Sequence, residues 1–284
     1  MKLIYGFAGF ALFIVSAAVL AQGGLKIEVY TSGPDGFSVN STVVYGEQEA
    51  ILIDPQFLLS EAHRLAAVIL ESGRELKTVY VTHAHPDHYF GIAVIQQAFP
   101  NARFVALTKV VTGIREGWMA RYNFWKNNYG HNLPASGPIL PEPLEGTTLT
   151  LEGEVLEITG AVEGDGPDNS YVWIPSLKAV IGGDILFSGS HFVVPKDHSK
   201  WDNTIEQIIA LKPEIVVPGH QVKGAPNDFS ILEFMQNYMR DFDAAVVASK
   251  TAEEVQSRIK SQYPGMGLEL LLNIGSQAAF TAQR

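Results

Sequence analysis

The feature that most restricts the fold of this 284-residue chain is the segment 83–88, HAHPDH, which follows a buried strand predicted at 78–81. His83 and His85 are two residues apart, so an extended strand end presents both on one side of the chain. The proline at 86 predicts a tight turn that brings the following acid and histidine round to a helix start. Three imidazoles and one carboxylate are therefore held close together by local geometry alone.

This donor set predicts a metal site. Imidazole and carboxylate are the ligands that zinc and similar cations take where thiolate is absent, and the chain has no cysteine. The segment also holds three of the eight histidines, a concentration that is uncommon among scattered histidines. We therefore predict one or two bound zinc ions, with iron or manganese as alternatives. The residues concerned are His83, His85, Asp87 and His88.

The order of predicted elements indicates an α/β fold. Alternating or β-branched strands and amphipathic helices occur in one half of the chain, and the same order returns in the second half. This order predicts two αβ halves packed sheet to sheet with helices outside, which is a four-layer αββα sandwich. The predicted strands are 25–31, 38–46, 50–53, 78–81, 104–107, 148–151, 154–159, 170–174, 178–181 and 215–217, and the predicted helices are 58–70, 89–99, 203–211 and those after 229.

Residues 108–145 differ from their surroundings and predict a helical insertion. Five aromatic side chains crowd this segment, and a proline-rich loop follows them. The aromatic residues either belong to the core or face a substrate, and the sequence leaves both readings open. They are Trp118, Tyr122, Phe124, Trp125 and Tyr129.

Residues 1–21 predict a secretory signal peptide. An apolar run at 3–20 follows a positively charged start, and Val19 and Ala21 have the small-residue pattern of a cleavage site. Cleavage after Ala21 would leave 22–284 as a single secreted or periplasmic domain without stable membrane association. An uncleaved anchor is the alternative, because the run is nearly long enough to span a bilayer.

The charge balance disfavours nucleic acid as a partner. The formal net charge is −10 and no cluster of lysines and arginines is visible, so the chain offers no concentrated positive charge for a phosphate backbone. A small-molecule substrate is the expected partner, and the oligomeric state is left open.

The motif His-x-His-x-Asp-His after a buried strand resembles the signature of the metallo-β-lactamase superfamily. Three further residues match that family's pattern in order and spacing: Asp54 at an early strand end, Asp184 after Gly182-Gly183, and His220 after Pro218-Gly219.

The resemblance implies the sandwich of that family and a role for each residue. It implies that His83 and His85 bind a first metal, that Asp87, His88 and His220 bind a second, and that Asp184 bridges the two. Asp54 would orient one of the histidines.

The chain departs from the family in one place. Relatives supply a third histidine to the first metal, but aligning the strand from Tyr171 puts Gly166 in that position. We expect Asp165, or failing it Glu163, to enter the first metal site. His191 would bind substrate or metal unless it is a packing residue. Three other histidines are expected to be surface or packing residues, namely His63, His131 and His198.

The expected function is an exported metal-dependent hydrolase in which Asp87 and Asp184 serve catalysis. A metal-activated water would attack a small carbonyl compound, with a lactone or ester favoured. The alternatives are a β-lactamase and a redox or non-catalytic iron-binding member with a degraded first site.

Overall fold

The structure is a computed structural model that describes residues 24–135 and 137–281. The predicted signal peptide at 1–21 lies outside the described residues. Within these residues, the structure contains no helix with the length and apolar character that a membrane crossing requires.

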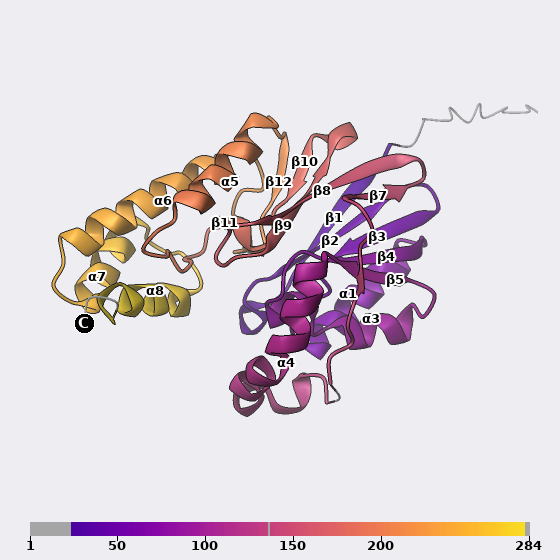
Figure 1. Cartoon of the computed structure of the whole chain (residues 1–284), viewed down its shortest axis with the longest axis horizontal. Coiled ribbons are helices and arrows are strands. Elements are labelled where there is room, and N and C mark those ends of the chain that lie inside the picture. The colour runs from indigo at the N-terminus through magenta and orange to yellow at the C-terminus, as the bar shows by residue number, and fades with distance from the viewer. Residues whose placement is uncertain (1–23, 136, 282–284) are drawn as a thin grey trace, which may run out of the picture.

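Two β-sheets lie face to face at the centre of the molecule (Figure 1). The first sheet is formed, in order, by β1 (Lys26–Thr31), β2 (Asn40–Tyr45), β3 (Glu49–Ile53), β4 (Glu75–Val81), β5 (Arg103–Ala106) and β6 (Glu142–Pro143). The second sheet is formed, in order, by β12 (Ile215–Val217), β10 (Ala179–Ile181), β9 (Asn169–Ile174), β8 (Glu154–Val162) and β7 (Thr148–Leu151). A short parallel pair joins β11 (Phe187–Ser188) to β13 (His220–Gln221).

Helices cover the outer face of each sheet, so the predicted four-layer sandwich is confirmed (Figure 1). The first sheet is covered by α1 (Leu59–Glu71), α2 (Pro86–Tyr89), α3 (Ile92–Ala98) and α4 (Thr108–Tyr129). The second is covered by α5 (Ser199–Ala210), α6 (Ser230–Val247), α7 (Ala252–Gln262) and α8 (Glu269–Thr281). One apolar cluster lies under each helical layer and a third lies between the sheets.

The strand sequences explain this layering. In β3, Ile51 and Ile53 belong to the cluster between the sheets, while Ala50 and Leu52 belong to the cluster under the helices. Alternate side chains point to opposite faces of a sheet, and both faces are covered here. Apolar residues at every position of a strand therefore stabilise the sandwich on both sides.

The structure divides one predicted helix and confirms the predicted helical insertion. The helix predicted over 89–99 is divided into α2 and α3. Gly91 lies between them, and a Cβ there would lie 1.9 Å from the carbonyl oxygen of Pro55. The chain can pass this point only without a side chain. The insertion predicted at 108–145 is confirmed, since α4 occupies 22 residues of it.

Candidate metal centre

The candidate metal residues lie on loops that follow strands at one edge of the sandwich. Strands β3 and β4 are parallel, so Asp54 and the segment 83–88 leave the first sheet at the same edge. Strands β10 and β12 are also parallel, so Asp184 and His220 leave the second sheet together. The hairpin between β8 and β9 adds the turn 163–168. Loops on a rigid scaffold of this kind are common places for functional side chains.

Four side chains form what we call the second group: Asp87, His88, Asp184 and His220. Nε2 of His88 lies 3.0 Å from Oδ1 of Asp184, 3.5 Å from Nε2 of His220 and 3.7 Å from Oδ2 of Asp87. Nε2 of His220 lies 3.2 Å from Oδ1 of Asp184 and 3.4 Å from Oδ2 of Asp87. These residues come from both halves of the chain.

These separations fit a tetrahedral cation site. Four ligand atoms placed tetrahedrally about 2.1 Å from an ion lie about 3.4 Å from one another. Oδ1 of Asp184 is buried and takes part in no hydrogen bond, although two imidazole nitrogens lie near it. The ligand atoms therefore point toward a shared position rather than at each other, which is the arrangement that a bound cation requires.

The first group consists of His83, His85, Asp165 and Asp184. Oδ2 of Asp184 lies 3.1 Å from Nε2 of His83 and 3.2 Å from Nδ1 of His85. Oδ2 of Asp165 lies 3.2 Å from the same Nδ1 atom. Asp184 thus presents Oδ1 to the second group and Oδ2 to the first, which is the position of a bridging ligand.

Asp54 orients one histidine of each group, His88 directly and His83 through Thr82. Its Oδ1 accepts a hydrogen bond from the backbone N–H of Thr82, and its Oδ2 accepts one from the Thr82 hydroxyl. That hydroxyl has a single hydrogen, so it accepts from Nδ1–H of His83 at 2.9 Å. Oδ2 of Asp54 also accepts from Nδ1–H of His88 at 2.9 Å. In the neutral state both histidines therefore present an unprotonated Nε2 to the metal position.

His220 is oriented in the same way by a backbone group. Its Nδ1–H donates to the carbonyl oxygen of Phe37 at 2.8 Å, which leaves Nε2 free to bind a cation. The ring also stacks on Phe187, with centroids 5.1 Å apart and planes within 4°.

The carboxylates and imidazoles of the two groups shift each other's pKa values. Burial alone would raise the pKa of Asp184, but the imidazoles of His88, His83 and His220 hold it well below its usual range. Burial alone would lower the pKa of His88, but Asp184, Asp54 and Asp87 hold it well above its usual value. A cation that binds here must displace imidazole protons, so its affinity falls as the pH is lowered.

Gly166, which aligns with the missing histidine, contributes no side chain to the first group. The side chain that reaches the first group is Asp165, whose amide N–H donates to the carbonyl oxygen of Asp184. A Cβ at Gly166 would meet no atom within 4 Å, and the backbone there is not left-handed. Glu163 belongs to neither group among the residues that the structure describes. The turn thus supplies a carboxylate to the first group, and the residue that provides it is Asp165 rather than Glu163.

His191 does not join the site. It is buried among the helices that cover the second sheet, where its Nδ1 lies 2.8 Å from the hydroxyl of Tyr238. Burial lowers the pKa of His191 to about 4, so the ring is neutral at physiological pH. His198 is also occupied elsewhere, since its two nitrogens contact Asp202 and Asp243. The alternative reading of His191 as a packing residue is the one that the structure supports.

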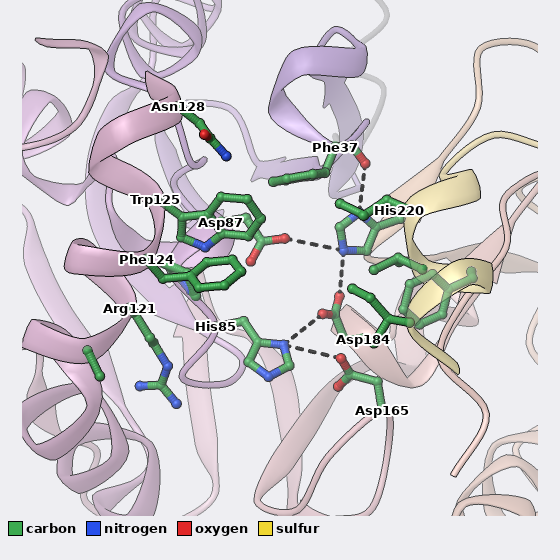
Figure 2. Close-up of a pocket in the computed structure, with 16 residues that line it drawn as sticks. Phe37, His85, Asp87, Arg121, Phe124, Trp125, Asn128, Asp165, Asp184 and His220 are labelled. Carbon is green, nitrogen blue, oxygen red and sulfur yellow. Dashed lines mark hydrogen bonds and ion pairs between the residues drawn. The ribbon is translucent and has the colours of Figure 1, made fainter. Parts of the chain in front are cut away.

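Both groups open into one pocket of about 530 Å³ (Figure 2). Its floor includes His85, Asp87, Asp165, Asp184 and His220, and its walls come from α4 and α8. The remaining lining side chains are mostly apolar or aromatic, and they are Phe37, Pro86, Ala120, Phe124, Trp125, Phe187, Leu270, Leu271 and Ile274, together with Arg121 and Asn128.

The aromatic residues of the insertion divide between the two readings. Trp118 is buried, and its ring lies 4.7 Å from Phe90 and 5.7 Å from Tyr122, so these residues belong to the core. Phe124 and Trp125 instead line the pocket (Figure 2). The aromatic residues of α4 therefore include both core residues and pocket residues, on different faces of the helix.

Sequence reasoning missed several pocket residues. Leu270, Leu271 and Ile274 on α8 face α4 across the pocket, although about 140 residues separate the two helices in the chain. Leu270 and Ile274 are about half exposed, so the amphipathic pattern of α8 gives a weak signal for them. Arg121 and Lys126 are both charged residues among the aromatic residues of the insertion, so the sequence alone does not single out Arg121.

A comparison with protein-family models identifies the family. Residues 34–220, more than half of the chain, match the sequence model of the Metallo-beta-lactamase superfamily. Persulfide dioxygenase ETHE1, mitochondrial, of Mus musculus is 41% identical over 58 residues, which are 20% of this chain and 22% of that protein. The match therefore spans about a fifth of that curated relative.

Solved structures show the same fold. The BLEG-1 B3 metallo-beta-lactamase is 20% identical with a TM-score of 0.54, covering 69% of this chain and 91% of that one. The metallo-beta-lactamase from Pontibacter korlensis is also 20% identical, with a TM-score of 0.55 and coverage of 76% and 95%. The sec-alkyl sulfatase PisA1, as a double mutant, is 14% identical with a TM-score of 0.60, covering 86% of this chain and 47% of that one.

Proposed function

Because the chain belongs to the metallo-beta-lactamase superfamily, we propose that it is a metal-dependent hydrolase of a small carbonyl compound, with a lactone or ester favoured. The observation that carries this proposal is that the two ligand groups and an apolar wall line the same pocket. A substrate with an apolar part can lie against α4 and α8 while its labile bond lies over the ligand groups.

The two groups fit divalent cations. Zinc is the first expectation for a donor set of imidazoles and carboxylates, and the third carboxylate, Asp165, keeps iron and manganese as alternatives. When bound, such a cation supplies a positive charge that polarises a carbonyl oxygen and makes water a nucleophile near neutral pH.

The chain's own residues position the reaction. Asp184 holds the two groups together through its two oxygens. Asp87 lines the pocket beside His220, where its carboxylate can accept the proton of the attacking water and pass it to the leaving group. Phe124 and Trp125 form an apolar side of the pocket against which the apolar part of a substrate can pack.

A substrate panel tests the proposal. Purified protein loaded separately with zinc, manganese and iron would be assayed on aliphatic lactones, aryl esters, β-lactams, alkyl sulfates and a thiol persulfide. Metal-dependent turnover of lactones or esters above the other classes is the expected result. Preferred hydrolysis of β-lactams or of alkyl sulfates, or oxygen consumption with the persulfide, would replace the proposal with that activity.

We also propose that the protein is exported, on the basis of the apolar run that ends at Val19-Leu20-Ala21. N-terminal sequencing of protein recovered from its native host should give a start at or near Gln22. Recovery of intact 1–21 in the membrane fraction would contradict export and support an anchor.

A further inference from the structure

Arg121 is a cation in the pocket without an acidic partner. It lies on the wall that α4 contributes, below Phe124 and on the side of the pocket where His85 lies (Figure 2). Its Nη1 donates a hydrogen bond to the carbonyl oxygen of Gly113 at 2.8 Å. Within 24–135 and 137–281, no carboxylate forms an ion pair with its guanidinium.

Two glycines of α4 set the direction of this side chain. Positions 113, 117 and 121 are four residues apart and share one face of the helix. A Cβ at Gly117 would lie 2.1 Å from Nη1 of Arg121, so the guanidinium lies flat along the helix in the space that this glycine leaves. The arginine therefore points back toward Gly113 instead of out into solvent.

Gly113 lies directly against the metal-ligand loop. A Cβ at Gly113 would be 3.0 Å from Cβ of Ala84, the residue between His83 and His85. The hydrogen bond to Gly113 thus holds the guanidinium against the part of α4 that packs on this loop. The position of the positive charge is fixed by that hydrogen bond and by the space that Gly117 leaves.

The charges of the pocket leave Arg121 available to a ligand. Asp87, Asp165 and Asp184 belong to the ligand groups, and cations bound there would neutralise them. A guanidinium has five N–H donors in a planar fork that matches carboxylate and sulfate oxygens. One donor is used by Gly113, and the guanidinium also lies near the hydroxyl of the buried Tyr89. No carboxylate forms an ion pair with the remaining donors among the described residues.

We propose that Arg121 is an anion-binding subsite, and that the pocket takes amphiphiles with an anionic group at Arg121 and an apolar chain between α4 and α8. As a statement about substrates, this inference rests on the proposed hydrolase function. The anionic group has two or three acceptor oxygens, as in a carboxylate or a sulfate. The apolar chain lies against Trp125 and Leu270.

Ligand binding tests the subsite separately from hydrolysis. Dissociation constants for decanoate, decyl sulfate and decan-1-ol would be measured by calorimetry on the wild type, on Arg121→Gln and on Arg115→Gln. Arg115 is the matched control, because it is an exposed arginine on the same helix and does not line the pocket. Metal content and thermal unfolding of each variant show whether it is folded and loaded.

In the wild type and in Arg115→Gln, at least one anion should bind about tenfold or more tightly than the alcohol, as expected for a charge-assisted hydrogen bond. Comparison of decanoate with decyl sulfate shows which anion fits better. Arg121→Gln should lose most of the preference while retaining the metal. A preference that persists in Arg121→Gln, or is absent from the wild type, would overturn the subsite. Failure of every hydrolysis assay would overturn the proposed function, but it would not affect the anion preference measured by calorimetry.

Discussion

Oδ2 of Asp165 lies 3.2 Å from Nδ1 of His85, so a carboxylate stands beside the histidine pair of the first group. The same nitrogen lies 3.2 Å from Oδ2 of Asp184. Compared with an imidazole in that place, a carboxylate adds negative charge and favours harder cations. The first group therefore carries two carboxylates and two imidazoles, and its metal preference follows from that balance.

Asp165→Asn should weaken metal binding at the first group by at least about tenfold, because a neutral amide oxygen replaces a charged ligand. The measurement is metal stoichiometry by mass spectrometry after dialysis against a weak chelator. Gly166→Ala is the matched control, since a Cβ there meets open space and needs no left-handed backbone. Equal metal content in the wild type and Asp165→Asn would show that the carboxylate is not a ligand.

Asp54→Asn should reduce metal affinity about 10–100-fold, because His88 loses the charged acceptor that orients its ring. Asparagine is the informative substitution. Asp54 has a φ of 59°, which asparagine tolerates and alanine does not. Calorimetric metal titration checks the effect, and unchanged affinity in a folded variant would remove Asp54 from the account.

Two tryptophans of α4 should respond differently to alanine. Trp118→Ala should lower the free energy of unfolding by about 3–5 kcal/mol, because it empties a buried aromatic site. Trp125→Ala should change the preferred length of the substrate's apolar chain with a smaller loss of stability, because Trp125 lines the pocket. Denaturant unfolding and a chain-length series of esters measure the two effects. The opposite pattern would reverse the assignment of core and pocket faces.

His191 should make the fold sensitive to acid. Its pKa is lowered to about 4 by burial, so the unfolded chain, with a pKa near 6.5, binds the proton more tightly than the folded chain. This contribution to stability is fully present above about pH 6.5 and is lost as the pH falls toward 4, to a total of about 3 kcal/mol. The difference in unfolding free energy between the wild type and His191→Asn should therefore shrink over that interval. A pH-independent difference would contradict a neutral buried imidazole.

The fold and much of the metal centre could be predicted from the sequence, because their signals are local. The strand before His83 and the turn at Pro86 set the ligand loop without help from the rest of the chain. Asp184 and His220 have no local signal of comparable strength. They were assigned by the resemblance, and parallel pairing of β10 with β12 brings them to the same edge.

The path of the turn between β8 and β9 could not be predicted. Strand β8 continues to Val162, beyond the predicted end at 159, and a register shift occurs between Gly160 and Val162 where it pairs with β9. The choice between Asp165 and Glu163 as the carboxylate near His85 depends on this backbone path, for which the sequence holds no local signal. The α8 wall could not be predicted either, because it depends on how distant helices pack.

Metal binding by the Asp184→Asn variant tests the central claim most directly, because Asp184 alone contributes to both groups. Metal-free wild type titrated with zinc should bind two equivalents per chain and gain hydrolysis of the preferred ester or lactone. The variant should bind fewer equivalents, more weakly at both groups, and lose most of that activity while remaining folded. Full activity of the wild type in excess chelator, or unchanged zinc binding and turnover in Asp184→Asn, would contradict the assignment of a metal-dependent hydrolase.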